Sequence, residues 1–389
     1  MLYLQPNYFI MIQDFHVKNF FSIREEQTLS FVPNADTDKR DMYVREVADG
    51  VELLKIGIVY GSNASGKTTI LRALDFFCEI MLDKPMSKND PIPFFPFLLD
   101  DHSRTEHSEM SMTFWIRGER YVLDIEFDEY RIYTEKFYVY FSSRRPTLLY
   151  DRKYQDDKDY SNVTFGKKAG IDMVTKRAIM GNTTNNCTVM AAFGQSNAVT
   201  SRLNDVYDYF CTGMNDILSP RGTLSFDVRD DLNNDTNGKL RSFLLKMLSM
   251  SDFNIVDMAI ENIEEKITPE MEVVIMNSPM PDEQKIEMLR RGTIRHEDLI
   301  FRHRGDNGLF ALHERFESAG TMRFLEMSAM LYHAINANSL FLIDEIESSI
   351  HYELLSYYIK LFLANSEGTS QLLLTTHDIN LLNEDFIRR

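Results

Sequence analysis

The feature that most constrains this chain is a glycine-containing turn, GSNASGKT at residues 61–68. The short apolar run IGIVY before it predicts a strand, and TTILRALDFFCEIML after it predicts a helix. Strand, glycine turn and helix in this order match the P-loop pattern at every fixed position. Backbone N–H groups of such a turn point inward at phosphate, and the helix adds its positive end. A site for nucleotide phosphates is therefore predicted, with a plain glycine-rich turn as the less favoured alternative.

The residues expected to hold the nucleotide belong to this turn and to the first turn of the helix. They are Gly61, Ser62, Asn63, Ala64, Ser65, Gly66, Lys67, Thr68 and Thr69. Lys67 is expected to reach the β- and γ-phosphates as a point charge, so it is also a candidate catalytic residue. The hydroxyl of Thr68 is expected to be a Mg²⁺ ligand. ATP and Mg²⁺ are the predicted cofactors.

Two further apolar runs end in polar residues of the kind that this chemistry needs. LFLI at 340–343 is followed by Asp344 and Glu345, and LLL at 372–374 is followed by TTH, which ends at His377. Parallel strands deliver such groups at their carboxyl ends. Asp344 would hold Mg²⁺ through water, and Glu345 would act as the general base on the attacking water. His377 would hydrogen-bond the γ-phosphate. The alternative for Asp344 and Glu345 is that a strand simply runs into an acidic loop with no role in catalysis.

A helix start near the C-terminal end supplies one more candidate. In ESAGT, residues 317–321, Ser318 is placed to cap a helix, and Gly320 allows another backbone to approach closely. The positive end of this helix would then face a phosphate. A plain helix cap explains the motif equally well when the motif is taken alone.

The pattern along the chain predicts an α/β protein, because both ends alternate strand and helix, which favours a parallel sheet. IQDFHV at 12–17 predicts an edge-type strand, and SMTFWI, RYVLDIEFD and YRIYTEKFYVYF predict a small antiparallel sheet. We expect three parts. They are an N-terminal half of a nucleotide domain with this lobe (11–150), a mainly helical insertion in which MEVVIM is a short strand (151–305), and the C-terminal half (306–389).

Charge and composition narrow the class of function. The formal net charge is −17, whereas proteins that wrap nucleic acid non-specifically usually carry the opposite sign. A basic cluster, RRGTIRH at 290–296 with RHR at 302–304, is more typical of a solvated face than of a nucleic-acid site. Three widely spaced cysteines predict neither disulfides nor a zinc site. With no apolar run that could span a bilayer and no basic signal-peptide region, a cytoplasmic location is expected.

The order of the motifs resembles the ABC-type ATPase heads of SMC and OLD proteins. The opening IQDFHVKNFFSIREEQTLSF, together with ESAGT and DEIESSIH, resembles the AAA-type, OLD-like ATPases of bacterial anti-phage operons. Among these, the ATPases of PARIS defence systems are most similar, and RloA-like ATPases are the near alternative. The resemblance covers roughly 11–82 and 309–385. It implies an α/β ABC-type P-loop head with a mixed or parallel sheet, a small antiparallel β subdomain and a helical insertion.

The resemblance also implies roles. Ser318 and Gly320 would act in trans on the γ-phosphate bound by a second subunit, Ser348 and Ser349 would lie at the dimer seam, and Phe20 and Arg24 would lie near adenine. The sequence also departs from related families: the transporter motif LSGGQ is absent, and no long heptad run predicts a coiled coil. The family normally continues past the switch histidine, so a missing C-terminal piece is expected after Arg389, and Met11 is the expected start.

Two functions remain in competition. In the first, a slow, regulatory ATPase forms a head-to-tail dimer or a higher homo-oligomer around Mg-ATP. It would hold an operon-encoded effector, a toprim-type nuclease, until a phage trigger protein is sensed. In the second, the ATP-bound dimer clamps DNA in repair or restriction. The basic cluster at 290–304 is the only sequence feature that supports this second function. Nucleic acid is thus left open as a partner, and no membrane contact is expected.

Overall fold

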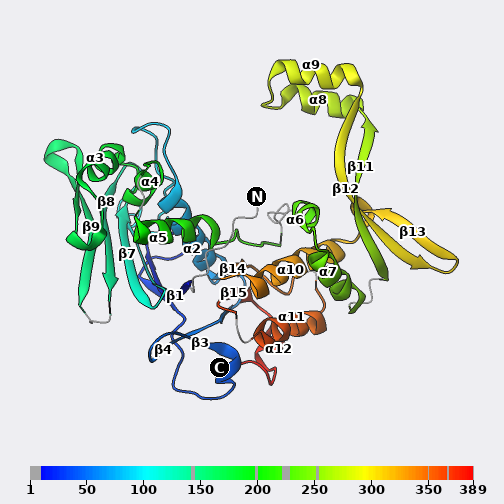
Figure 1. Ribbon diagram of the computed structural model, residues 1–389, viewed down its shortest axis with the longest axis horizontal. Helices are drawn as coiled ribbons and strands as arrows, with labels where there is room; N and C mark the ends of the chain where they lie inside the picture. Colours follow the sequence, from blue (N-terminus) through cyan, green and yellow to red (C-terminus); the bar gives the residue numbers. More distant parts are fainter. Residues whose placement is uncertain are drawn as a thin grey trace. The chain divides into compact units, whose positions relative to one another are not determined.

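The chain divides into two compact units. The computed structural model describes residues 10–141, 145–197, 200–220, 228–250, 254–348, 350–365 and 368–388. The first unit comprises Met1–Ser225 and His333–Arg389, and the second comprises Phe226–Tyr332. Helix α10 (Ala319–Asn336) begins in the second unit and ends in the first (Figure 1). The three-part division expected from sequence (11–150, 151–305 and 306–389) stays a prediction; residue 151 lies inside a strand, and residue 305 ends one.

A small parallel sheet forms the core that positions the candidate site. Its strands are β5 (Ile56–Tyr60), β14 (Leu340–Ile343) and β15 (Gln371–Thr376), in the order β14-β15-β5. Every residue of β14 and β15 is buried, which explains why their sequences are almost wholly apolar. The three strands expected at these positions are confirmed, but in β5 only Ile56 is fully buried. Because they are parallel, their carboxyl ends meet at one edge of the sheet.

An antiparallel sheet of seven strands forms a lobe of the first unit, in the order β10-β9-β8-β7-β6-β1-β2. The strands are β1 (Ile10–Lys18), β2 (Gln27–Ser30), β6 (Ser108–Ile116), β7 (Glu119–Phe127), β8 (Ile132–Tyr140), β9 (Pro146–Gln155) and β10 (Tyr160–Phe165). The three alternating runs expected as strands are confirmed as β6, β7 and β8. The expectation that residues 12–17 form an edge strand is wrong: β1 lies between β2 and β6, and β2 is the edge.

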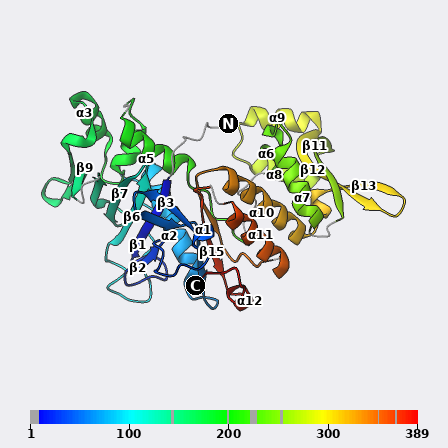
Figure 2. The ribbon, with the colours of Figure 1, turned by 60° about the horizontal axis from the view of Figure 1, so that its bottom comes forward.

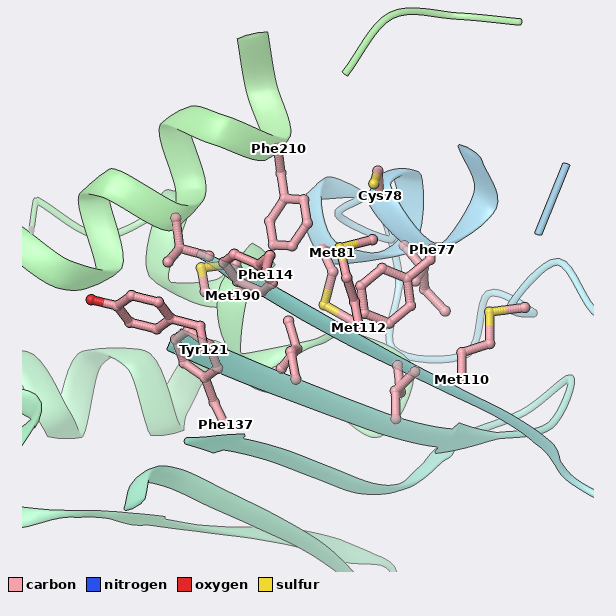
Figure 3. Packing of buried hydrophobic residues seen from close by; sticks show 14 of the residues in the cluster. Phe77, Cys78, Met81, Met110, Met112, Phe114, Tyr121, Phe137, Met190 and Phe210 are labelled. Atoms are coloured by element: carbon pink, nitrogen blue, oxygen red, sulfur yellow. The ribbon is translucent and has the colours of Figure 1, made fainter. Parts of the chain in front are cut away.

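Helix α2 (Lys67–Leu82) is buried against this lobe and carries much of the apolar core. The Phe77 ring packs edge-on against Phe15 of β1, with ring centroids 5.7 Å apart, and against Phe210 at 6.2 Å. Figure 3 shows Phe77 and Met81 beside Met112 and other residues of the same cluster. The lobe is completed by α3 (Met173–Asn182), α4 (Val189–Gly194) and α5 (Ser201–Thr212). This packing fixes α2, and with it the turn that precedes α2.

One side chain joins the lobe to the parallel sheet. Gln371, at the start of β15, accepts a hydrogen bond from the N–H of Ile12 in β1 at 2.6 Å and donates to the Ile12 carbonyl at 2.9 Å. Its amide nitrogen also donates to the carbonyl of Leu54 at 3.1 Å. Gln371 is 2% exposed, so these bonds replace water for groups that would otherwise be buried without partners. The amide thus acts as a stretch of backbone would.

The remaining elements of the first unit are short, apart from one helix. They are α1 (Arg40–Tyr43), β3 (Val44–Ala48), β4 (Val51–Leu54), α11 (Tyr352–Ala364) and α12 (Ile379–Leu382). Residues 214–218 run parallel to β14, with isolated bridges from Met214 to Leu340 and from Leu218 to Ile343. Among the described residues, no helix is both long and apolar enough to cross a membrane.

The second unit combines helices with a long antiparallel pair. Its elements are α6 (Val228–Asn234), α7 (Lys239–Met250), β11 (Ile255–Lys266), α8 (Pro269–Asn277), α9 (Asp282–Arg291), β12 (Thr293–Gly305), β13 (Gly308–His313) and the start of α10. Figures 1 and 2 show α8 and α9 at one end of the β11–β12 pair. The short strand expected at MEVVIM is wrong. This segment lies in α8, where the Thr268 hydroxyl accepts from the N–H of Met271 and Pro269 starts the helix.

Candidate nucleotide-binding site

The turn at 61–68 has the backbone of a phosphate cradle. Ala64 and Gly66 adopt positive φ values of 62° and 89°, and Gly61 donates its N–H to the carbonyl of Thr376 in β15 at 3.3 Å. A Cβ atom on Gly61 would lie 2.6 Å from Oγ of Ser65, so the turn closes tightly only because this residue is glycine. Helix α2 starts after Gly66 without a side-chain cap, so the positive end of the helix faces the turn.

Lys67 is folded back onto its own turn. Its Nζ donates to the carbonyls of Gly61 at 2.9 Å and Ser62 at 2.8 Å, and the residue is 7% exposed. The ammonium group is therefore held over the loop whose N–H groups would face phosphate. Four rotatable bonds let it exchange these carbonyls for phosphate oxygens.

Asp344 connects the acidic strand with the phosphate turn. The hydroxyl of Thr68 donates to the carboxylate oxygens of Asp344 at 2.9 and 3.1 Å. Thr375 in β15 donates to Oδ1 of Asp344 at 2.6 Å. The structure thus brings together the two residues expected to hold Mg²⁺, and both offer the oxygen ligands that this ion takes. Thr375 was not singled out from sequence, although its place one strand over from Asp344 is the signal that could have revealed it.

Glu345 occupies a strained and fixed position after β14. Its φ is 45°, in the left-handed region that residues with a side chain adopt rarely. The same Thr375 hydroxyl that donates to Asp344 accepts from the N–H of Glu345 at 2.8 Å. Ile346 continues this contact by donating its N–H to the Thr375 carbonyl at 3.1 Å. The direction in which Glu345 projects is therefore set by neighbouring strand β15.

His377 is held by the carboxylate of Glu347, a residue that is not among the candidates from sequence. Oε1 of Glu347 accepts from the N–H of His377 at 2.8 Å and lies 2.5 Å from its ring Nδ1. A carboxylate only accepts, so Nδ1 carries the hydrogen, and Nε2 is the atom left to meet a ligand. The His377 side chain is 49% exposed and that of Glu347 only 12%. Glu347 could have been found in DEIES, because it lies two residues after Glu345 on the loop that follows β14.

A pocket of about 610 Å³ lies beside the turn. The loop between β1 and β2 forms one wall, with Ser22 and Arg24, and the end of β5 and the turn form the other. The volume falls within the usual range for small-molecule sites. Of the two residues expected near adenine, Arg24 lines this pocket. Phe20 does not: it is 1% exposed and packs on the Phe76 ring at 5.5 Å.

The loop that lines this pocket is tied to α2 just beyond the phosphate turn. Oγ of Ser22 lies 2.7 Å from Oγ1 of Thr69, and a Cβ on Gly66 would lie 3.1 Å from the same Ser22 oxygen. Thr69 itself is 9% exposed. Its hydroxyl therefore fixes the pocket wall, a contact that the sequence did not indicate.

The ESAGT segment starts helix α10 in the second unit. Oγ of Ser318 accepts from the N–H of Thr321 at 3.0 Å, which confirms the expected helix cap. Gly320 lies in the first turn of the helix, and the preceding Glu317 is fixed by Nε2 of His303 at 2.5 Å. Ser318 and Gly320 are thus presented at a rigid helix start. Ser348 donates its N–H to the Glu345 carbonyl at 2.8 Å, and Ser349 lies outside the described residues.

The basic cluster of the second unit is partly neutralised. Arg291 pairs with Glu287 within α9, and Arg302 pairs with Asp257 across the strands at 3.4 Å. The side chain of Arg295 is not described, but its Cα partner in β11 is Glu264. Acidic residues thus accompany the cluster, as expected for a solvated face.

The sequence matches the family described as "AAA domain, putative AbiEii toxin, Type IV TA system" over residues 57–162 and 204–383. These stretches make up more than half of the chain and include the phosphate turn, ESAGT, the acidic pair and His377. The chain belongs to this AAA family. Membership confirms the expectation of an AAA-type ATPase domain, and the sheets described above confirm the expected α/β head. A search of curated proteins found no significant match.

Several solved structures have a similar course of the chain. The SMC head domain from Thermotoga maritima is 12% identical, with a TM-score of 0.39 and coverage of 96% of this chain and 91% of that one. RecF with ATP is 11% identical, with a TM-score of 0.38 and coverage of 100% and 95%. The Smc head with an extended coiled coil bound to the C-terminal domain of ScpA, from Pyrococcus furiosus, is 10% identical, with a TM-score of 0.43 and coverage of 96% and 91%. Because these scores are low, the reading of the site as an ATPase centre rests on the AAA family and on the contacts described above.

Proposed function

We propose that this protein hydrolyses ATP between two copies of itself and that the ATP-bound assembly controls a partner effector in defence against phage. The observation that supports the ATPase part most directly is the bond from Thr68 to Asp344. It joins the phosphate turn to the acidic strand within one unit, at 2.9 Å. A P-loop and an acidic pair in this relation are what phosphoryl transfer needs, since positioning and charge neutralisation supply most of the catalysis.

Each residue at this edge of the sheet then has a role. Lys67 would exchange its two carbonyls for oxygens of the β- and γ-phosphates, and Thr68 and Asp344 would hold Mg²⁺, whose charge would offset that of the phosphates. Glu345 takes a proton from the attacking water as general base. Nε2 of His377 contacts the γ-phosphate, with Nδ1 held by Glu347 at 2.5 Å.

The second copy supplies the remaining group. Ser318 and Gly320 lie at the positive start of α10, a place suited to a phosphate. We propose that they bind the γ-phosphate held by the partner subunit, so that two heads enclose two ATP molecules, as in a head-to-tail dimer or a larger ring. Ser348 would then lie at the seam. Hydrolysis by such an arrangement is slow, because the closed assembly and not the turnover carries the signal.

The role in defence is supported by two observations. The family description names a putative AbiEii toxin and a type IV TA system, and the motif set resembles OLD-like ATPases of anti-phage operons, among them those of PARIS systems. The proposed partner is a nuclease of the toprim type encoded in the same operon, released in the cytoplasm when a phage protein is sensed. The ion pairs within the basic cluster favour this reading over a DNA clamp.

The test is the native mass and composition of the complex purified from the whole operon, with and without Mg-ATP. The Glu345→Gln variant keeps the nucleotide bound, and Lys67→Ala serves as the control that cannot bind it. We expect an ATP-dependent homo-oligomer that carries a second operon protein, and a monomeric Lys67→Ala chain. A Glu345→Gln chain that stays monomeric at saturating Mg-ATP would overturn the dimer. An ATP-dependent dimer without a partner would overturn the effector role alone.

A further inference from the structure

A second polar pocket, remote in sequence from the phosphate turn, is built into the antiparallel lobe. It has a volume of about 530 Å³. It is formed by the loop after α2, the start of β10, helix α3 and the loop between α3 and α4. Its lining consists of Lys88, Asn89, Asp159, Tyr160, Ser161, Arg177, Met180, Gly181, Thr183, Thr184 and Asn185. None of these residues takes part in the ATPase chemistry proposed above.

The walls of this pocket are held in place by specific hydrogen bonds. The side-chain amide of Asn186 donates to the carbonyls of Ser87 and Asp90, both at 2.9 Å, and so fixes the turn that carries Lys88 and Asn89. The start of α3, which carries Arg177, is capped by Asp172. The pocket is therefore a formed feature of the fold.

A buried arginine lies directly behind the wall. Arg152 of β9 is 0% exposed, and its Nη2 donates to Oγ of Ser161 and to the carbonyls of Thr184 and Asn185, each at 2.9 Å. These three acceptors all belong to the pocket lining. Its cross-strand neighbour Glu135 is also fully buried and carries the opposite charge; its carboxylate accepts from the hydroxyl of Tyr150 at 2.7 Å and from the N–H of Val189 at 2.8 Å.

The pocket lining carries two cations, Lys88 and Arg177, and one acid, Asp159. Nε and Nη1 of Arg152 have no hydrogen-bond partner among the described residues. Lys88 and Arg177 are exposed and form no ion pair with any carboxylate in the part of the chain that the structure describes. The one acid in the lining, Asp159, accepts from the hydroxyl of Tyr154 at 2.8 Å and the amide of Asn185 at 3.1 Å, and its charge offsets one of the two cations. In a chain with a net charge of −17, such a local excess of cations is unusual.

We propose that this pocket binds a phosphate-bearing small molecule, with Lys88 and Arg177 as the groups that contact its phosphate. Arg177 offers a planar fork of donors, and Lys88 a mobile point charge, which together suit the tetrahedral arrangement of phosphate oxygens. Asn89, which is exposed in the lining, supplies an uncharged hydrogen-bonding group. The buried guanidinium of Arg152 holds three groups of the lining in place from behind.

The test uses inorganic pyrophosphate as the probe and isothermal titration calorimetry as the readout. All variants carry Lys67→Ala, so that the phosphate turn does not contribute binding. We expect one site in Lys67→Ala alone, and an increase in Kd of at least about tenfold when Lys88→Ala and Arg177→Ala are added, as for loss of charge-assisted contacts. The matched control is Lys167→Ala with Lys168→Ala, which removes the same charge from the same lobe outside the pocket, and its Kd should stay unchanged.

Three outcomes would overturn the proposal. They are no binding to the Lys67→Ala chain, binding that survives the Lys88→Ala and Arg177→Ala changes, and an equal loss in the Lys167→Ala and Lys168→Ala control. The last would mean that diffuse surface charge attracts the probe. Urea denaturation of each variant checks that both pairs of changes leave the lobe folded. Failure here leaves the ATPase proposal untouched, because the two sites share no residue.

Discussion

Glu347 holds His377 by two contacts from a single oxygen, one to the backbone N–H at 2.8 Å and one to Nδ1 at 2.5 Å. The ring is thereby fixed both in place and in tautomer, although half of the side chain is exposed. We expect Glu347→Gln to lower the ATP hydrolysis rate by roughly 10- to 100-fold, since a misdirected imidazole loses its share of catalysis. ATP affinity should change little. Steady-state hydrolysis and nucleotide binding measure both, and a loss of affinity equal to the loss of rate would contradict a positioning role.

Thr375 allows a sharper test of the acidic edge, because a single hydroxyl meets both Asp344 and Glu345. Thr375→Val keeps the shape of the side chain and leaves a buried N–H and a carboxylate oxygen short of a partner. The free energy of unfolding should fall by about 1–3 kcal/mol, and Mg²⁺-dependent hydrolysis should fall with it. Thr375→Ser, which keeps the hydroxyl, is the control. Equal behaviour of the valine and serine variants would show that the hydroxyl does nothing.

The assigned roles of Lys67 and Glu345 predict opposite defects. Lys67→Ala should abolish nucleotide binding, because the positive charge over the turn is lost. Glu345→Gln should bind ATP normally and hydrolyse it at least about 100-fold more slowly, because an amide cannot accept the proton. Equilibrium binding of a fluorescent ATP analogue and phosphate release separate the two defects. Hydrolysis by Glu345→Gln at the wild-type rate would remove Glu345 as general base.

Asp75 on α2 predicts a specific dependence of stability on pH. Burial, with help from the charges of Glu79 and Asp216, raises the pKa of the Asp75 carboxyl from 3.8 to about 7. The folded state therefore binds a proton that the unfolded state releases between about pH 4 and 7, and this group's contribution to stability is lost as pH rises through that window. Asp75→Asn should be more stable than the wild type at pH 8 by on the order of 2 kcal/mol. The advantage should vanish near pH 4; an advantage that is the same at both pH values would contradict the assignment.

Gln371 predicts that the lobe and the parallel sheet lose stability together. Gln371→Met fills the same space and removes all three hydrogen bonds to Ile12 and Leu54. Because the Ile12 groups are buried, unfolding should become easier by about 2–4 kcal/mol. Urea denaturation followed by far-ultraviolet circular dichroism measures this change. Gln371→Glu, which keeps one acceptor but buries a carboxylate against the carbonyls of Ile12 and Leu54, should destabilise the protein at least as much as Gln371→Met.

Much of the site could be read from sequence because its parts are local. The phosphate turn needs particular residues at fixed spacing, and LFLI and QLLLTT are apolar because both faces of a parallel strand are buried. The partners that complete the site are Thr375, Glu347 and Ser22. Their contacts are set by tertiary packing, so the sequence carries only indirect signals: Thr375 lies one strand over from Asp344, and Glu347 lies two residues after Glu345. The place of β1 inside the sheet depends on its pairing with β6, which lies about 90 residues further along the chain. Local alternation alone therefore does not reveal it.

The second unit shows where local pattern misleads. MEVVIM is rich in residues that favour strands, but Thr268 caps a helix just before this segment, and Pro269 is the first residue of that helix. A cap and a fixed φ act at a single position and outweigh a weak preference summed over six residues. The insertion expected to be mainly helical also contains a long antiparallel pair, β11 with β12. Few residues of β11 are buried, so its sequence lacks the apolar alternation that would predict a strand.

The two ends of β15 are bound to different things. At one end, Gln371 is hydrogen-bonded to Ile12 of β1 in the lobe. At the other end, Thr375 is hydrogen-bonded to Asp344, and the Thr376 carbonyl accepts from the N–H of Gly61 in the phosphate turn. All six residues of β15 are buried and closely packed, so we expect the strand to move as a rigid unit. A shift of β1 by a fraction of an ångström would therefore reach the atoms that orient Asp344 and Glu345. The lobe and the acidic edge are thus joined through one short buried strand, and a change in the lobe is expected to alter the positions of Asp344 and Glu345.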